Sequence, residues 1–302
     1  MRPIVVFSDI DGTLIDIFTR EYGNSKELMK KLGESLIPVI LCSSKTMAEQ
    51  EKIRKDLGLE GEPFIIENGG AVIIPNGYFD GGRGNDDHDI DDEDEGYNSL
   101  KHHEVGVRDN GGYKIIELGR SSKEIRKILQ VVRHRTGIAF NGVSDFSIED
   151  LAKKVGMNHD EAERMSKRKF GETILEIDKT KIEQFEQALS IEGLKVIHGG
   201  RYFDVTSGND KGKAVRILID LYLEKFGHNT TFIGVGDSPN DVPMLRMTDI
   251  AILVQKPDGT WSEVKNNSNI SHLVKIKGIG PAGWESAFAI IMKEAERNNN
   301  AA

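Results

Sequence analysis

Hydrophobic and polar positions follow two designs along this chain. In the first design, runs of consecutive apolar residues end in small or polar groups, at residues 4–7, 37–41, 231–235 and 250–254. An uninterrupted apolar run predicts a strand that is covered on both faces of a parallel sheet. Stretches with helical periodicity, at 46–57 and 211–226, accompany these runs. The pattern therefore predicts an α/β core of parallel strands with helices on both faces.

The second design occupies the middle of the chain. After a short hairpin at 71–77, the strand candidates alternate apolar and polar positions, which predicts an antiparallel sheet with one covered face. These strands lie at 113–118, 173–177, 195–197 and 202–206, between helices at 122–135, 147–165 and 180–189. We expect an inserted α+β domain at 83–206 that divides the core into two parts, 1–82 and 207–302.

Composition sets the class of protein. A chain of 302 residues with 38% hydrophobic and 29% charged residues is typical of a globular protein with room for two domains. Its apolar runs are shorter than the roughly 18 residues that a membrane span needs, and it begins with a strand. We therefore expect a cytoplasmic protein without a membrane partner. The single cysteine, Cys42, excludes an internal disulfide, and its place at the end of an apolar strand predicts a buried packing residue.

The net charge of −9 is concentrated in one segment. Residues 84–96 contain eight acidic residues and no lysine or arginine, and without these eight charges the net charge is −1. Such a run predicts a solvated insertion, and its role stays open. The rest of the chain has no basic stripe, so we expect no nucleic-acid partner. The eight acidic residues are Asp86, Asp87, Asp89, Asp91, Asp92, Glu93, Asp94 and Glu95.

The first apolar run leads into two carboxylates, Asp9 and Asp11, followed by Gly12 and Thr13. Side chains alternate along an extended chain, so the two carboxylates point the same way and repel unless a cation lies between them. Ligands of open α/β sheets bind beyond the carboxyl ends of the strands, and Mg²⁺ prefers oxygen ligands. A calcium hand is disfavoured because Gly12 comes too early in the pattern. A turn with two solvated carboxylates is the structural alternative.

Three further segments carry chemistry at a strand end or a helix start: Ser43, Lys211 and the loop 236–241. Phosphoryl transfer needs an in-line nucleophile, positive charge on the equatorial oxygens and an acid for the leaving oxygen. The four segments together supply each part. Taken singly, Ser43 also fits a strand-end cap, Lys211 a solvated helix start, and Asp237 and Asp241 helix-capping acids.

In this order, the four segments resemble the motifs of the haloacid dehalogenase superfamily. The resemblance implies a Rossmann-like core in which Asp9 is the nucleophile and forms an aspartyl-phosphate. It also implies that Asp11 acts as general acid and then general base, with Ser43 and Lys211 as the other catalytic residues.

The same resemblance implies a magnesium cofactor. The expected ligands are the Asp9 carboxylate, the Asp11 backbone carbonyl and Asp237. Asp241 either binds the metal or braces the loop.

The position of the inserted domain, between Ser43 and Lys211, resembles the class IIB cap branch of this superfamily. Segments 41–50, 66–71, 234–241 and 280–284 are similar to phosphatases of glycosyl-3-phosphoglycerates such as the mannosyl ester. The acidic insertion departs from that pattern. The resemblance implies a magnesium-dependent phosphatase of a phosphorylated sugar-glycerate, in the synthesis of a compatible solute. It leaves open whether the sugar is mannosyl or glucosyl, and the oligomeric state.

A substrate with a phosphate, a carboxylate and a polyhydroxyl ring needs cations and polar groups around it. Arginine forks suit carboxylates, and flanking glycines allow close approach. The cationic cluster at 164–169 fits an ordinary solvated helix end equally well. The candidate substrate-binding residues are Ser44, Lys45, Glu67, Asn68 and Gly69 in the core and Arg164, Arg168, Gly199, Gly200 and Arg201 in the inserted domain.

Three other functions fit the same residues, and the first is another sugar-phosphate phosphatase of the class IIB branch. A phosphomannomutase shares the fold and the nucleophile but returns the phosphoryl group to a sugar. A sugar-phosphate sensor would keep the fold without catalysis, and the intact set of Asp9, Asp11, Ser43, Lys211 and Asp237 argues against it.

Overall fold

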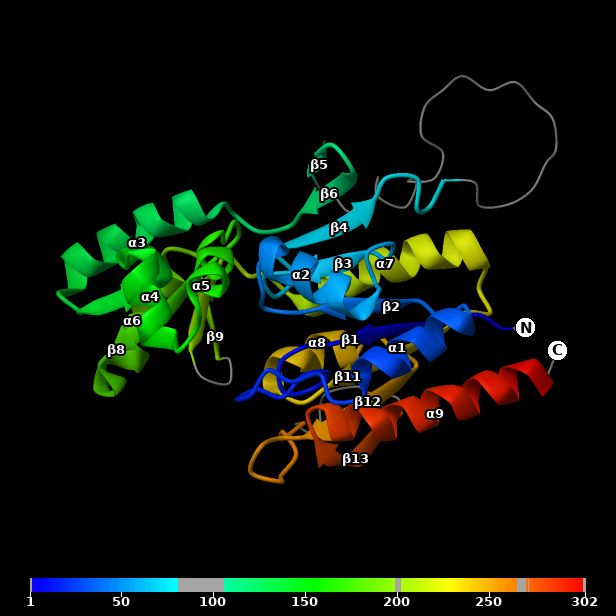
Figure 1. The fold of residues 1–302 in the computed structure, drawn as a ribbon. Coiled ribbons are helices and arrows are strands. Elements are labelled where there is room, and N and C mark those ends of the chain that lie inside the picture. The colour runs from blue at the N-terminus through cyan, green and yellow to red at the C-terminus, as the bar shows by residue number, and fades with distance from the viewer. Residues whose placement is uncertain (1, 81–105, 199–201, 265–269, 271, 301–302) are drawn as a thin grey trace, which may run out of the picture.

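The computed structural model describes residues 2–80, 106–198, 202–264, 270 and 272–300. The acidic run at 84–96 and three of the candidate substrate residues, Gly199, Gly200 and Arg201, lie outside the described residues. Figure 1 shows a core with an inserted domain beyond one end of its sheet, and both termini toward the opposite end.

The predicted parallel core is confirmed. All four apolar runs form neighbouring strands, in the order β12-β11-β1-β2, and each pairs in parallel with the next. The strand nearest the N-terminus, β1, lies in the interior of the sheet, and all five of its residues are buried. These strands are β1 (Ile4–Ser8), β2 (Val39–Cys42), β11 (Thr231–Gly236) and β12 (Ile250–Gln255).

Five more strands extend this sheet on both sides. β13 (Leu273–Ile279) and β3 (Phe64–Ile66) continue the parallel arrangement. On the β3 side, the sheet then turns antiparallel through β4 (Ala71–Pro75), β6 (Tyr113–Glu117) and β5 (Gly106–Asp109).

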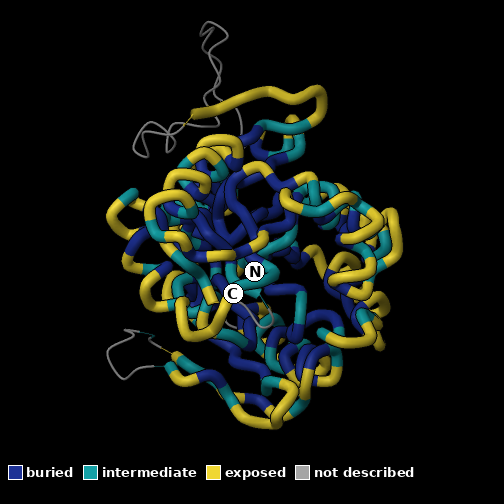
Figure 2. The backbone as a smooth tube through the Cα atoms, turned by 90° about the vertical axis from the view of Figure 1, so that its left-hand side faces the viewer, coloured by how far each residue is buried: buried dark blue, intermediate teal, exposed yellow. Residues whose placement is uncertain are grey.

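Helices cover both faces of the sheet because each strand presents apolar side chains to both. Within β1, Ile4 and Val6 belong to one buried cluster, and Val5 and Phe7 to the other. The first cluster packs under α1 (Ser25–Glu34), α2 (Met47–Leu57) and α9 (Pro281–Asn300), the second under α7 (Lys211–Phe226) and α8 (Val242–Leu245). Figure 2 shows the buried backbone running through the centre with exposed turns outside.

Local sequence fixes where the helices at the site begin. α2 starts with a capping box, in which the Thr46 hydroxyl accepts from the Glu49 amide and the Glu49 carboxylate accepts from the Thr46 amide. α7 starts at Lys211 because the Asp210 carboxylate accepts from the amides of Gly212 and Lys213. Both starts lie at the edge of the sheet where the parallel strands end.

The inserted domain has the antiparallel sheet that the alternating pattern predicts, in the order β7-β8-β10-β9. The expected single helical region at 147–165 is two helices, α4 and α5, because Gly156 caps α4 in a left-handed conformation. Two buried clusters pack the helices around this sheet. Its elements are α3 (Ser122–Thr136), β7 (Phe140–Gly142), α4 (Ile148–Val155), α5 (His159–Ser166), β8 (Glu172–Ile177), α6 (Ile182–Ile191), β9 (Lys195–His198) and β10 (Phe203–Thr206).

One strand belongs to a different sheet from the one predicted. Residues 113–118 were expected in the antiparallel sheet of the inserted domain, but β6 pairs with β4 in the large sheet. The reason is that Ile115 and Ile116 fill the two opposite core clusters, so this strand is apolar on both faces. We propose that the inserted domain begins near residue 119, and not at 83, and ends near residue 206.

Among the residues that the structure describes, no helix is both long and apolar enough to cross a membrane. Cys42 is buried, as its position in an apolar strand predicts, and burial raises the pKa of its thiol above the usual value.

Replacing Leu36 with glycine should stabilise the fold. Leu36 has a φ of 56° and its side chain is 88% exposed, so it carries left-handed strain with little burial in return. Removing that strain should outweigh the added entropy of a glycine and raise the free energy of unfolding by about 0.5–1 kcal/mol in urea titrations. Leu36→Ala keeps the strain and is the matched control. An equal gain in both variants would contradict this explanation.

Candidate active site

An ion-paired triad occupies the carboxyl end of the central strands. Asp9 follows β1 directly, and its Oδ1 accepts a hydrogen bond from Lys211 Nζ at 2.7 Å. The same ammonium donates to Asp241 Oδ1 at 2.6 Å. All three residues are buried. Burial alone would lower the pKa of Lys211, but the carboxylates of Asp241 and Asp9 raise it above the usual value, so this lysine is a fixed positive charge.

Asp237 lies beside this triad, after the end of β11. Its Oδ1 accepts from the Thr13 hydroxyl at 3.2 Å, and its backbone carbonyl accepts from Ser262 Oγ at 2.7 Å. Gly12 has a φ of 82°, and a Cβ there would lie 2.8 Å from Asp237 Oδ2. The glycine that follows Asp11 is therefore required both by the turn and by the closeness of the Asp237 carboxylate.

Asp241 braces the loop that carries Asp237. Its Oδ2 accepts from the backbone amides of Asp237 at 3.1 Å and Ser238 at 3.0 Å, while its Oδ1 holds Lys211. Both oxygens of this carboxylate thus have protein partners. Of the two roles that the sequence leaves open for Asp241, these contacts favour the loop brace.

The residues fit a divalent cation. Carboxylate oxygens of Asp9, Asp237 and Asp241 lie within 4.8 Å of one another. Burial, with a smaller contribution from Asp241, raises the pKa of Asp9 to about 7 and that of Asp237 to about 8. The single positive charge of Lys211 is thus too little to neutralise the carboxylates of this cluster. Mg²⁺ prefers hard oxygen donors such as these carboxylates. Asp9 and Asp237 would hold it through their carboxylates, and Asp11 through its backbone carbonyl.

Asp11 and Lys45 form a second ion pair at the site. Asp11 Oδ2 lies 2.8 Å from Lys45 Nζ, and Glu49 Oε1 lies 3.9 Å from the same ammonium. Burial alone would lower the pKa of Lys45. The carboxylates of Asp11 and Glu49 more than offset this effect, so the pKa of Lys45 lies above its usual value. Lys45 precedes α2, so the start of that helix positions the lysine against Asp11.

A cavity of about 200 Å³ lies over these groups, between the core and the inserted domain. It brings together six predicted site residues: Asp9, Asp11, Ser44, Lys45, Asp237 and Arg168. Its opposite wall comes from the inserted domain, with Met165, Thr173, Tyr202 and Asp204 among the lining residues. A small polar ligand in this cavity would touch both domains.

Ser43 and Arg164 lie near the cavity without lining it. Ser43 is buried, and its Oγ accepts from the Lys45 amide at 3.3 Å. The Arg164 backbone carbonyl accepts from Thr46 Oγ1 at 2.9 Å, which ties α5 to the start of α2. Arg164 lines a neighbouring cavity of about 300 Å³ that shares Lys45 and Arg20 with the first. The predicted roles of Ser43 and Arg164 remain predictions.

Glu67, Asn68 and Gly69 are buried and do not line the cavity. The Glu67 carboxylate accepts from the amides of Lys169 at 2.7 Å and Phe170 at 2.8 Å. A Cβ on Gly69 would lie 2.3 Å from the Asp210 carbonyl oxygen. Glu67 and Asn68 therefore join the two domains through protein contacts, whereas Gly69 packs against Asp210 within the core.

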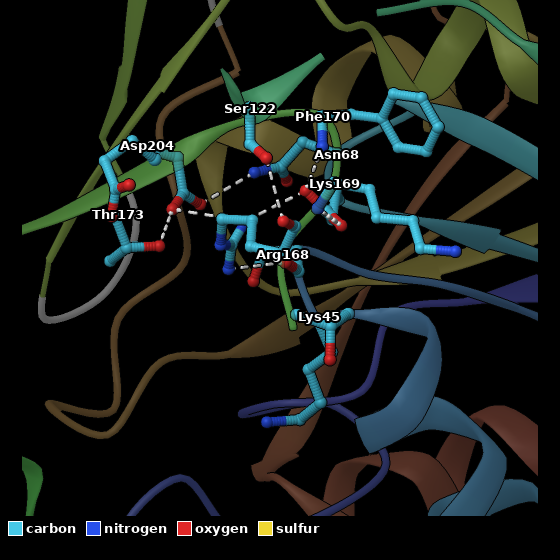
Figure 3. Close-up of polar contacts among 12 residues, drawn as sticks. Lys45, Asn68, Ser122, Arg168, Lys169, Phe170, Thr173 and Asp204 are labelled. Atoms are coloured by element: carbon cyan, nitrogen blue, oxygen red, sulfur yellow. Dashed lines mark hydrogen bonds and ion pairs between the residues drawn. The ribbon is translucent and has the colours of Figure 1, made fainter. Parts of the chain in front are cut away.

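Arg168 spans the same contact and reaches the cavity. Its Nη2 donates to the Ser44 carbonyl at 3.1 Å, and its Nη1 lies 3.8 Å from Glu67 Oε2 and 3.7 Å from Asp204 Oδ1. Its Nε is buried without a hydrogen-bond partner among the described residues. Figure 3 shows this guanidinium among the side chains of both domains.

Sequence reasoning missed three residues at the site. Asp204 is the one acidic residue of β10, but apolar and polar residues alternate in this strand, so the sequence alone gives Asp204 no distinct signal. Arg20 has a φ of 61° and pairs with Glu161 of the inserted domain at 3.0 Å, which no pattern indicates. Trp284 is buried, and its Nε1 donates to Ser8 Oγ at 2.9 Å, which in turn donates to the Asp9 carbonyl. Trp284 therefore supports the backbone at Asp9.

Comparison with known proteins gives one family and several relatives. Residues 6–266 match the sequence model of the haloacid dehalogenase-like hydrolases. A glucosyl-3-phosphoglycerate/mannosyl-3-phosphoglycerate phosphatase of Methanococcoides burtonii is 38% identical over 98% of this chain and 98% of its own. A mannosyl-3-phosphoglycerate phosphatase of Pyrococcus horikoshii is 34% identical over 90% of this chain and 97% of its own. A solved structure described as a HAD subclass IIB sugar phosphatase superimposes with a TM-score of 0.57, at 17% identity, over 97% of this chain and 98% of its own.

Binding of Mg²⁺ should release protons near neutral pH. Without metal, Asp9 and Asp237 keep their protons up to pH values of about 7 and 8, and the cation must displace them. The apparent affinity should therefore rise with pH through this range and level off above it. Calorimetric titrations in two buffers of different ionisation enthalpy measure the proton release directly. Asp237→Asn should bind more weakly and release fewer protons, and an affinity independent of pH would contradict the assignment.

Proposed function

The chain belongs to the haloacid dehalogenase-like hydrolases, and from that premise we propose that it is a magnesium-dependent phosphatase of a glycosyl-3-phosphoglycerate. It releases phosphate and the glycosylglycerate. Two nearly full-length relatives with that activity in their names support the proposal. The observation that carries it is Asp9, buried against Lys211 and Asp237 on the floor of a cavity that both domains line.

Asp9 is the nucleophile of this proposal. An Asp9 carboxylate oxygen attacks phosphorus, and an aspartyl-phosphate forms as the ester P–O bond breaks. Asp11 enters this step as the protonated carboxylic acid and gives its proton to the leaving alkoxide, and Lys45 Nζ lies 2.8 Å from Asp11 Oδ2 in the structure. Asp11 then takes a proton from the water that attacks the aspartyl-phosphate, and this restores the Asp9 carboxylate. Lys211 keeps its charge beside Asp9 throughout, at 2.7 Å.

The remaining groups neutralise and orient the phosphate. When bound, Mg²⁺ supplies positive charge that reduces the repulsion between the anionic Asp9 and the phosphate, so that the two can approach each other. The Asp9 and Asp237 carboxylates and the Asp11 carbonyl hold it. Ser43 donates a hydrogen bond from its hydroxyl to a phosphoryl oxygen. This requires a change in its present contact, in which the Ser43 oxygen accepts from the Lys45 amide.

The cavity accounts for only part of the substrate. Its volume of about 200 Å³ is below the roughly 300–1,000 Å³ typical of ligand sites. A groove of about 930 Å³ adjoins it and shares Arg20 and Ser238 with it. The phosphate and glycerate carboxylate fit the cavity, near Lys45 and Arg168, and the sugar extends toward the groove. Ser44 belongs to the same proposed substrate site. Gly199, Gly200 and Arg201 stay predictions, because they lie outside the described residues.

The proposal covers both mannosyl and glucosyl esters, because one relative carries both in its name. The product, a small charged polyhydroxy molecule, suits a compatible solute made in the cytoplasm.

A panel of phosphate esters tests the substrate class. With Mg²⁺ present, phosphate release from mannosyl- and glucosyl-3-phosphoglycerate should exceed release from 3-phosphoglycerate or hexose phosphates by at least about tenfold in kcat/KM, since only the former fill both parts of the site. Equal rates across the panel would leave a general sugar phosphatase. Transfer of the phosphoryl group to a hexose phosphate, in place of release, would overturn the proposal in favour of a mutase.

Asp9→Asn should abolish phosphate release while substrate still binds. An amide cannot form the aspartyl-phosphate, so kcat should fall by about 10³-fold or more. Asp220→Asn is the matched control, because Asp220 pairs with Arg216 on the same helix as Lys211 but faces away from the site. Measured binding of unreacted substrate to Asp9→Asn separates lost chemistry from lost folding. Residual turnover within tenfold of the parent would exclude Asp9 as the nucleophile.

A further inference from the structure

Three successive residues between β3 and β4 adopt a left-handed backbone. Their φ angles are 49° at Glu67, 57° at Asn68 and 86° at Gly69. Only glycine adopts this conformation freely, although asparagine tolerates it better than most residues. A non-glycine pair in this region persists only where surrounding contacts hold it, and such turns gather at functional sites. The contacts of this turn therefore indicate what it is for.

On one side, the turn grips the inserted domain. Glu67 accepts two backbone amides of the 168–170 segment, and Asn68 Nδ2 donates to Asp204 Oδ2 at 2.9 Å. Asp204 is itself fixed by Thr173 Oγ1, 2.5 Å from its Oδ1. Ser122 anchors the 168–170 segment from within the inserted domain, with bonds to the carbonyls of residues 168 and 169. Figure 3 shows Asn68 directed at Asp204 across this contact.

On the other side, the turn reaches the loop that carries Asp237. Asn240 Nδ2 donates to Asn68 Oδ1 at 3.1 Å. Ser238 Oγ donates to Asn240 Oδ1 and lies 3.1 Å from Asp241 Oδ2. Asp241 holds Lys211, and Lys211 holds Asp9. A continuous chain of polar contacts thus runs from the inserted domain to the nucleophile.

The charge at one end fixes the direction of the first bonds in this chain. An ionised Asp204 can only accept, so Asn68 must present its Nδ2 there and its Oδ1 to Asn240. Asn240 must then donate through its own Nδ2, which leaves its Oδ1 to accept from Ser238. Asn68 contacts both the inserted domain and the Asp237 loop through one amide group, and it is 1% exposed and absent from the cavity wall.

We propose that Asn68 is a positioning residue, which sets the Asp237 loop in its metal-binding arrangement when the inserted domain is seated on the core. Only the expected effect of Asn68 on kcat rests on the proposed function. Because Asn68 does not line the cavity, it acts through Asn240 and Asp204 and not through contact with substrate.

Asn68→Gly tests this directly, because glycine keeps the left-handed turn and removes only the bridging amide. Calorimetric titration with Mg²⁺ alone should show the dissociation constant raised about five- to tenfold, the loss expected for one hydrogen bond. In phosphate-release assays, kcat should fall by a similar factor while KM changes less than about threefold. Leu36→Gly, a left-handed position far from this chain of contacts, should change neither value.

A double-mutant cycle separates a connected chain from two independent contacts. If the effects of Asn68→Gly pass through Asn240, then Asn68→Gly with Asn240→Ala should weaken Mg²⁺ binding no more than the worse single variant. Thr173→Val, at the far end beside Asp204, should produce a smaller change of the same sign. Asn240→Ala carries the test alone if Asn68→Gly does not fold.

The outcomes remain distinct from those of the proposed function. Unchanged Mg²⁺ affinity and kcat in Asn68→Gly, with only a lower melting temperature, would mean a merely structural residue and would overturn the inference. Additive losses in the double variant would also overturn it. If no glycosyl-3-phosphoglycerate is hydrolysed at all, the metal titrations still decide whether Asn68 positions the loop.

Discussion

The buried ammonium of Lys211 is the interaction on which the site depends. It lies between Asp9 and Asp241 at 2.7 and 2.6 Å, with all three side chains removed from water. Loss of one partner from such a group leaves an uncompensated charge, which is far more destabilising than the intact pair is stabilising. Since Asp9 ends β1, Lys211 begins α7 and Asp241 follows β11, this group also fixes three core elements relative to one another. Catalytic geometry and packing of the sheet edge therefore have the same origin.

Four of the parallel strands, β1, β2, β11 and β12, could be predicted from the sequence because each is a largely apolar run that ends in small or polar residues. β13 gave no such signal, because Lys275 and Lys277 interrupt it. Strand ends at one edge of a sheet bring Asp9, Lys211 and Asp237 together without further information. The contacts of Glu67 and Asn68 could not be predicted in this way. Their partners, Phe170 and Asp204, are more than 100 residues away and lie in the inserted domain. Only the seating of one domain on the other determines which side chains face the cavity and which face protein. The sheet to which Tyr113–Glu117 belongs was predicted wrongly for a related reason. Its pairing with β4 and the burial of Ile115 and Ile116 on opposite faces depend on residues that are distant in the sequence.

The charge lining the cavity explains why these residues need a cation that the chain does not supply. Among the described residues, carboxyl groups from Asp9, Asp11, Glu49, Asp204 and Asp237 line it, against the cations Arg20, Lys45 and Arg168. Each of these cations is already paired, with Glu161, Asp11, or the Glu67 and Asp204 carboxylates. A phosphate ester that enters the cavity therefore meets cations that are already neutralised by carboxylates. The remaining oxygens around it belong to acidic side chains. Protonation of Asp9 and Asp237 relieves the repulsion below pH values of about 7 and 8, but in the proposed reaction it would also remove the nucleophile. In the proposed function, a divalent cation would relieve the same repulsion and leave Asp9 ionised, so metal binding and nucleophilic attack would be coupled at this sheet edge.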